Sequence, residues 1–433
     1  MARRAMRLAL GCAALALLAA PAAQAAPIVW WHWGDEETYE ELRPAVEAFE
    51  RESGRRVEVS AVSWDELRDR LIISLIAGIG PDVSAVSTRW FEELAAQGVF
   101  VDLGPFLAQE PPGELDDFFP VSLDLWRTAD GTLYALPIDN DIQILFFNAD
   151  RFEQAGIAPP GESWDWDDWL EAGIRHTVDE TGDGHIDRYG MSPWFFTWYS
   201  LVWANGGSFF DESGRPAADG PELREALNWW AQWHPPHHGA LLLWDELIHL
   251  GYDPTQDGTP PEAWRGGRVA MLPAGAWMPT YFVWQESAQN WAFRFGAAPL
   301  PRSPAGGRAT VLEGQGLAVA ATAREPQAAY AFVRWMSGAE AQRIIASFGR
   351  YPVRRSVALS DRFFLPPERW PADRQAVVEA LSYARPAPKG VHWATAWEEI
   401  GELRQFFHGR VGLDEALDAL NRRLQARLDS LGG

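Results

Sequence analysis

The segment "GTLYALPIDNDIQILFFN", residues 131–148, holds two short apolar runs separated by a polar break. Leu133–Leu136 and Ile142–Phe147 have the length and composition of strands, so both are predicted to be strands. The break between them is Pro-Ile-Asp-Asn, and proline cannot continue the hydrogen-bonded ladder inside a sheet. This break therefore marks the place where the pattern of the chain changes.

Before the break, the chain alternates strands with amphipathic helices. Ile28–Trp31 is a short apolar strand, Val57–Ala61 alternates like a strand, and "PDVSAVS", residues 81–87, forms a third. The helix between the second and third strands repeats one apolar residue at helical spacing: Leu67, Leu71 and Leu75. This β-α-β-α-β order predicts a parallel sheet covered by helices, and therefore the α/β class.

After the break, the chain is richer in helices and aromatic residues. Residues 164–275 are mainly helical in pattern, while 268–277 and 294–301 are strand-like. The C-terminal helix has one apolar stripe, formed by Leu413, Leu417, Leu420, Leu424 and Leu428. Such a stripe packs on the body of a domain. A second α/β unit, richer in helix, is therefore predicted.

Residues 1–25 have the form of a signal peptide. Arginines at positions 3, 4 and 7 precede the apolar run Leu8–Ala20, and Ala23–Ala25 is a small-residue cleavage site. The apolar run is shorter than the roughly 20 residues of a membrane-spanning helix. We therefore expect cleavage near Ala25 and an exported, periplasmic protein. The only cysteine, Cys12, lies in the leader, so no disulfide is expected.

The charge of the chain restricts its partners. The formal net charge is −23, which argues against nucleic acid and anionic membrane surfaces because both require clustered basic residues. The 24 tryptophans are the feature of the composition that suggests a ligand.

Several stretches carry a resemblance to a known family. They include "IVWWHWGDEE" at 28–37, the pattern LP-x(9)-FN-x-D-x-F at 136–152 and the pattern G-x-VAM-x(3)-GAW at 267–277. Together they make the chain similar to periplasmic solute-binding proteins of ABC importers, in the sugar-binding family that includes the maltose-binding protein. The resemblance implies a two-lobe type II periplasmic-binding-protein fold with hinge crossovers and a ligand cleft between the lobes. It also implies a saccharide ligand, an ABC transporter permease as partner and a monomeric protein.

The proline breaks predict where the lobes begin and end. They lie at Leu136-Pro137, Leu300-Pro301 and Tyr351-Pro352. The first lobe is expected to contain 27–137 and 300–350. The second lobe is expected to contain 141–298 and 353–433.

The resemblance also nominates ligand-binding residues. A sugar offers apolar C–H faces to aromatic rings and hydroxyl groups to charged or amide side chains. The positions that match cleft residues of the family are Trp33, Asp35, Glu36, Ser87, Arg89, Asp139, Asp141, Phe195, Trp198, Trp277, Glu313, Gln315 and Trp397. Trp277 and Trp397 are the expected stacking aromatics, although each ring could instead fill core volume. The maltose-binding pattern has a carboxylate where this chain has Arg89, which weakens any transfer of maltose specificity.

The acidic segment "DETGDGHIDRYG", residues 179–190, resembles a calcium-binding loop. Its candidate ligands are Asp179, Thr181, Asp183, His185 and Asp187. The twelfth residue is Gly190 rather than the bidentate glutamate of an EF-hand loop. We therefore favour a loop closed by its own Asx turns, with calcium bound weakly if at all, and we expect no cofactor.

Two other function classes remain open on the sequence. A binding protein for a polyamine, glycerol 3-phosphate or a peptide would need the same fold. An exported glycosidase needs only two suitably spaced carboxylates, which an acidic chain supplies easily. The sequence has no nucleophile elbow, Cys–His pair or HExxH motif. A binding protein rather than an enzyme is therefore predicted.

Overall fold

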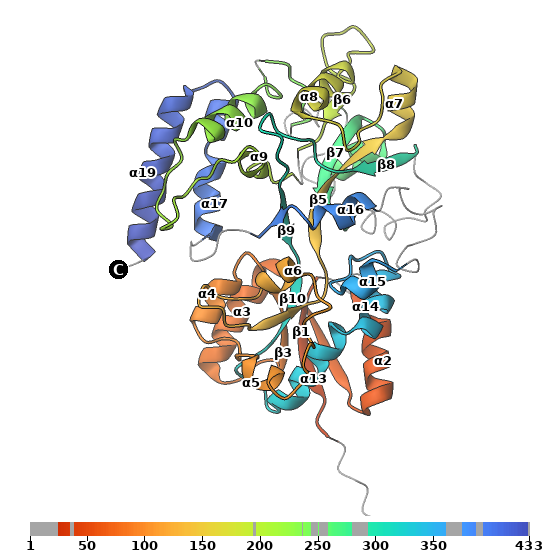
Figure 1. Ribbon diagram of the computed structural model, residues 1–433, viewed down its shortest axis with the longest axis vertical. Helices are drawn as coiled ribbons and strands as arrows, with labels where there is room; N and C mark the ends of the chain where they lie inside the picture. The colour runs from red at the N-terminus through yellow and green to blue at the C-terminus, as the bar shows by residue number, and fades with distance from the viewer. Residues whose placement is uncertain are drawn as a thin grey trace, which may run out of the picture.

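The protein is described by a computed structural model that covers residues 25–34, 39–193, 196–235, 237–243, 250, 259–278, 293–360, 375–386 and 393–431. Two lobes, each built on its own sheet, lie one above the other (Figure 1). This mixed α/β architecture with two sheets confirms the predicted fold class. Within the described residues, no helix is both long and apolar enough to cross a membrane.

The sheet of the first lobe has the strand order β2-β1-β3-β10-β4. β1 (Ile28–Trp33) pairs in parallel with β2 (Val57–Val62) and β3 (Val83–Ser87). β10 (Gln315–Val319) is antiparallel to β3 and to β4 (Ala135–Pro137). Helices surround this sheet: α2 (Arg43–Ser53), α3 (Trp64–Ala77), α13 (Pro326–Met336) and α14 (Ala339–Ala346).

Strand alternation decides which of the N-terminal aromatic residues enter the core. Along β1, burial alternates, with Trp30 fully buried and Trp31 and Trp33 half-buried. Trp30 packs edge-on against Phe332 of α13, with ring centroids 5.5 Å apart. Trp33, at the carboxyl end of β1, is left at the edge of the sheet that faces the second lobe.

The sheet of the second lobe has the order β11-β9-β5-β7-β6, with β8 paired to β5. Its central strand, β5 (Asp141–Asn148), is antiparallel to β7 (Val269–Gly275), β8 (Phe295–Ala298) and β9 (Thr310–Glu313). β6 (Tyr189–Met191) pairs in parallel with β7, and β11 (Ala384–Arg385) pairs in parallel with β9. Helices α8 (Trp166–Arg175), α9 (Ser200–Ala204), α10 (Pro221–Ala231), α17 (Trp393–Gly401) and α19 (Leu413–Leu431) belong to this lobe.

Much of the tryptophan content is core of the second lobe rather than ligand surface. Trp166 stacks on Trp229 at 4.6 Å, and Trp169 lies 5.7 Å from both Trp229 and Trp233. All four rings are buried. The predicted apolar stripe of the C-terminal helix packs on the same lobe, because Leu417, Leu420 and Leu424 are buried there.

The structure differs from the predicted lobe limits at two places. Residues 300–313 belong to the second lobe, because Leu300 is buried in its core and β9 pairs with β5. Residues 353–358 stay with the first lobe, where Val353 O accepts from Phe119 N and Arg354 pairs with Glu114 at 3.1 Å. The chain passes Leu300-Pro301 after β8 and continues in the second lobe as far as β9. The other predicted limits stay a prediction.

Two adjacent segments among the described residues carry the chain between the lobes, and a further passage leads from residues 353–358 of the first lobe to β11 of the second through residues that are only partly described. The first crossing runs from β4 to β5 through residues 138–140, and the second runs from β9 to β10 through Gly314. Gln342 of α14 donates to Ile138 O at 2.9 Å, and Asn140 Nδ2 donates to Pro352 O at 3.0 Å. These contacts attach the first crossing to the first lobe.

Candidate functional site

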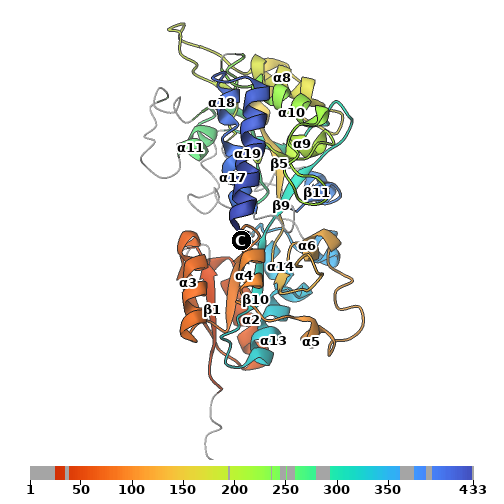
Figure 2. The same cartoon turned by 90° about the vertical axis from the view of Figure 1, so that its left-hand side faces the viewer.

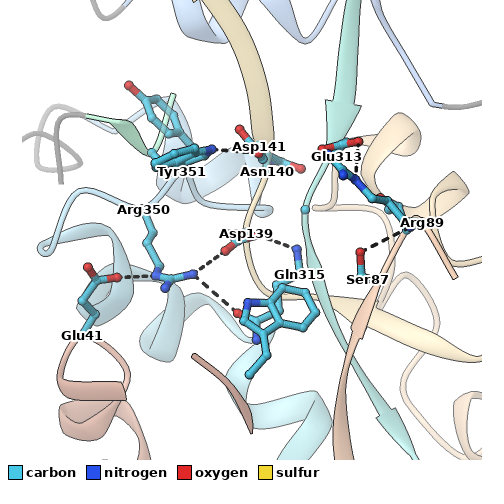
Figure 3. Close-up of a pocket in the computed structure, with 14 residues that line it drawn as sticks. Glu41, Ser87, Arg89, Asp139, Asn140, Asp141, Glu313, Gln315, Arg350 and Tyr351 are labelled. Atoms are coloured by element: carbon cyan, nitrogen blue, oxygen red, sulfur yellow. Dashed lines mark hydrogen bonds and ion pairs between the residues drawn. The ribbon is translucent and has the colours of Figure 1, made fainter. Parts of the chain in front are cut away.

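A cavity of about 460 Å³ lies where the two crossings pass between the sheets (Figure 3). The residues that line it are Trp33, Glu41, Ser87, Thr88, Arg89, Asp139, Asn140, Asp141, Trp277, Glu313, Gly314, Gln315, Arg350 and Tyr351. Trp33 and Ser87 stand at the carboxyl ends of parallel strands, where open α/β sheets place their ligands. Trp277 and Glu313 come from the second lobe, so both lobes line the cavity.

Most of the predicted site residues line this cavity. They are Trp33, Ser87, Arg89, Asp139, Asp141, Trp277, Glu313 and Gln315. Their contact with a ligand stays a prediction. Asp35, Glu36 and Phe195 lie outside the described residues.

Two predicted aromatic residues are not among the residues that line the cavity. Trp198 packs edge-on against Phe407 with centroids 5.1 Å apart, and Trp397 meets Tyr199 edge-on at 4.8 Å. Both tryptophans are half-buried against the core of the second lobe. Aromatic packing within the lobe accounts for both positions without a ligand.

One aromatic ring of the cavity is held by a carboxylate. Trp277 follows β7, and its Nε1–H donates to Asp141 Oδ2 at 3.0 Å. The second oxygen, Asp141 Oδ1, is buried and has no hydrogen-bond partner among the described residues. Gly275 makes this geometry available, because a Cβ there would lie 2.2 Å from Trp277 Nε1 and 2.3 Å from Asp141 Oδ1.

The carboxyl group of Asp141 is in an unfavourable environment for charge. Burial raises its pKa well above the ordinary value, and the nearby carboxylates of Glu313 and Asp139 raise that pKa further. The Trp277 N–H and the Arg89 guanidinium act in the opposite direction but do not cancel the rise. A hydrogen-bond donor on a ligand would therefore stabilise the ionised form of the Asp141 carboxyl group.

An ion pair links the two lobes across the cavity. Arg89, which follows β3, lies with its Nε 3.5 Å from Glu313 Oε1 at the end of β9. Glu313 raises the pKa of Arg89, and burial opposes that rise. The Arg89 side chain remains half-exposed, so its guanidinium is accessible to a ligand.

A largely buried arginine, which was not nominated from the sequence, forms the wall opposite the Arg89–Glu313 pair (Figure 3). Arg350 contacts Glu41 and donates through Nη1 to Asp139 Oδ2 at 2.6 Å and Gln315 Oε1 at 3.5 Å (Figure 3). Burial alone would lower the pKa of Arg350, but the carboxylates of Glu41 and Asp139 raise it above the ordinary value. The stretch "RYPVRRS", residues 350–356, also resembles the family of sugar-binding proteins and could have pointed to Arg350, although not to its partner Glu41.

Comparison with known proteins places the chain in a family. The model of bacterial extracellular solute-binding proteins matches residues 33–343. This protein is a member of that family. A Brucella abortus (strain 2308) protein named as a binding protein is 23% identical over 84% of this chain and 82% of its own length.

Solved structures share the fold of this solute-binding protein. A Listeria monocytogenes ABC substrate-binding protein in complex with cycloalternan has a TM-score of 0.78 at 20% identity, covering 93% of this chain and 99% of the other. The sugar-binding protein MalE of Xanthomonas citri has a TM-score of 0.76 at 21% identity, covering 94% and 98%. These likenesses confirm the two-lobe architecture.

The acidic loop of this solute-binding protein uses its own carboxylates internally. Asp179 accepts from the amides of Gly182 at 2.6 Å and Gly184 at 2.8 Å. Asp187 accepts from the amides of Glu180 and Thr181. Among the described residues, no group of three or more acidic, histidine or cysteine side chains is arranged to hold a metal ion. Weak calcium binding by this loop stays a prediction.

Proposed function

We propose that this exported protein captures a saccharide in the cavity between its lobes and delivers it to the permease of an ABC transporter. The observation that carries the proposal is the pairing of Trp277 with Asp141 beside Arg89 and Glu313. An indole ring covers an apolar sugar face, while the charged groups around it can bind hydroxyls. The cavity is also large enough for a small-molecule site.

We also propose that the protein acts in the periplasm. The segment 1–25 would direct export, and the mature protein would act as a periplasmic monomer. Membership of the extracellular solute-binding family supports this setting. Release of the solute to a permease requires the two lobes to separate, which lobes built on separate sheets and joined by crossing segments allow.

A cationic solute, such as a polyamine, is the second candidate. The cavity is lined by four carboxylates, Glu41, Asp139, Asp141 and Glu313, against two guanidinium groups, Arg89 and Arg350. Both arginines contact carboxylates, whereas Asp141 accepts the indole N–H of Trp277 on one oxygen and, among the described residues, has no hydrogen-bond partner on the other. An ammonium group could sit between Asp141 and the aromatic rings.

A thermal-shift screen of the protein without residues 1–25 separates the two candidates. The panel contains mono-, di- and oligosaccharides, polyols, polyamines, glycerol 3-phosphate and short peptides. A ligand at 100 times its dissociation constant stabilises the folded state by about 2.7 kcal/mol, which such a screen detects. We expect a saccharide to give the largest shift. A rise in melting temperature with polyamines alone would show that the ligand is a cation instead of a saccharide.

A protein that only captures and delivers a saccharide leaves its bonds intact. A saccharide that raises the melting temperature should be recovered unchanged after prolonged incubation, as chromatography would show. Release of shorter products would instead indicate glycosidase activity of the carboxylate pair Asp141 and Glu313.

A further inference from the structure

Arg350, in the first lobe, contacts both the crossing at residues 138–140 and the segment that follows Gly314. It directly follows the turn that ends after α14, at Gly349. Its Nη1 donates to Asp139 of the first crossing at 2.6 Å and lies 3.5 Å from Oε1 of Gln315, the first residue after the second crossing. Its Nε donates to Glu41, two residues before α2 begins. One guanidinium therefore joins three segments that are far apart in sequence.

Asp139 extends this contact from one crossing to the other. While Oδ2 accepts from Arg350, Oδ1 accepts from the backbone N–H of Gln315 at 2.6 Å. The crossings also lie very close to each other, because a Cβ built on Gly314 would be 2.7 Å from the carbonyl oxygen of Asp139. Asp139 therefore connects the two segments to each other and, through Arg350, to the first lobe.

The contacts of Arg350 are strong because they are sheltered from solvent. The exposed fractions of the side chains are 14% for Arg350, 9% for Glu41 and 13% for Asp139. Removing one member of a buried ion-pair group leaves uncompensated charge, which is strongly unfavourable. The planar guanidinium also bonds several partners at fixed angles, which an ammonium cannot reproduce.

We infer that Arg350 is a positioning residue that sets the angle between the lobes by holding the crossings at 138–140 and at Gly314 against the first lobe. The crossings lead directly into β5 and out of β9, whose ends carry Asp141 and Glu313. A change in crossing geometry therefore moves these residues relative to Ser87 and Arg89 on the first lobe. The inference rests on the proposed function only in naming the cavity as the ligand site.

Distances between spin labels in the unliganded protein test this inference directly. The chain without its leader has no cysteine, so Ile76→Cys on α3 and Ala426→Cys on α19 supply one exposed label in each lobe. Figure 2 shows α3 in the lower lobe and α19 in the upper one. The labelled pair is combined with Arg350→Met, Arg350→Lys and Glu41→Gln, and distance distributions are measured by pulsed electron resonance.

Arg350→Met should broaden the distance distribution or shift its maximum, and Arg350→Lys should do so to a smaller degree. Glu41→Gln, which keeps a hydrogen-bond acceptor, should have the smallest effect. If Arg350→Met does not fold, the Arg350→Lys distribution decides. A distribution equal to that of the parent pair in the decisive variant would overturn the inference.

Arg324→Met is the matched control. Arg324 also pairs with a buried carboxylate, Asp82, at 2.6 Å, but both residues belong to the first lobe. We expect this variant to lose stability and to keep the parent distance distribution. An equal broadening in Arg324→Met would show that Arg350 acts only through general stability, and would also overturn the inference. Because no saccharide is present, neither outcome depends on whether the protein binds sugar.

Discussion

At the scale of single residues, substitution of Trp277 tests whether this ring contacts the ligand or only packs in the core. The ring is half-buried and lines the cavity, so its removal takes away contact area for a sugar face. Trp277→Ala should weaken binding of the screened saccharide by about 1–4 kcal/mol, the range for interface anchors. Calorimetric titration measures this change. Unaltered affinity would remove Trp277 from the site.

Trp397→Ala is the comparison for Trp277→Ala. Trp397 packs edge-on against Tyr199 and is not among the residues lining the cavity. We expect a denaturant melt to show a loss of stability, approaching the roughly 3–5 kcal/mol of a buried tryptophan, with a smaller loss of affinity than in Trp277→Ala. An equal loss of affinity in both variants would restore Trp397 as a stacking residue.

The titration of Asp141 makes stability depend on pH with a definite sign. Its pKa is raised in the folded protein, above the roughly 3.9 of an unfolded aspartate. The folded state therefore binds more protons between these two values, and the stability contributed by Asp141 falls as pH rises through that window. Asp141→Asn should gain stability relative to the parent as pH rises from about 4. Denaturant melts at a series of pH values measure this difference.

Asp82 provides the opposite sign within the same molecule. Burial acts to raise its pKa, but the hydrogen bonds from Arg324 and Val29 lower it overall. Its contribution is therefore present above the unfolded pKa and is lost as pH falls through the folded pKa. Asp82→Asn should thus lose stability relative to the parent as pH rises. The same sign in both variants would contradict the assigned environments.

At the scale of elements, the end of β7 depends on a glycine. Gly275→Ala would place a Cβ against Trp277 Nε1 and Asp141 Oδ1. We expect this variant to bind the screened saccharide more weakly than the parent, by calorimetric titration. Gly412→Ala is the control, because a Cβ there meets no atom within 4 Å. Parent-like affinity in Gly275→Ala would mean that the indole position is not important.

The acidic loop 179–187 should respond little to calcium. Its aspartates already accept amide hydrogens of the loop, so the loop is closed without an ion. Removing calcium with a chelator should leave the melting temperature nearly unchanged. A loss of more than about 2 kcal/mol of stability would show that the loop holds calcium tightly.

The helices and strands of the first lobe were predictable because each has a strong local pattern of apolar residues, and that apolar face is buried in the structure. Leu67 and Leu71 repeat at helical spacing and are buried as expected. The limit at residue 300 was wrong because Leu300-Pro301 is only a local break. The true crossing, at Gly314, depends on pairing between Asp141 and Glu313, which lie far apart in sequence.

At the scale of the whole molecule, the site was predictable only in part. Arg89 and Trp277 lie in stretches that resemble family motifs, and both line the cavity. Arg350 and Glu41 are 309 positions apart and meet only because α2 and the segment after α14 fold onto the same lobe. No local pattern signals such a pair. The tryptophan count also misled, because rings such as Trp166 and Trp233 form core instead of ligand surface.

Capture of a saccharide is tested by calorimetric titration of the protein lacking residues 1–25 with the saccharide that gives the largest thermal shift. Capture of a saccharide between the lobes predicts one binding site per chain, with much weaker binding in Trp277→Ala. Binding of a polyamine at that site, with no heat from any saccharide in the panel, would contradict it.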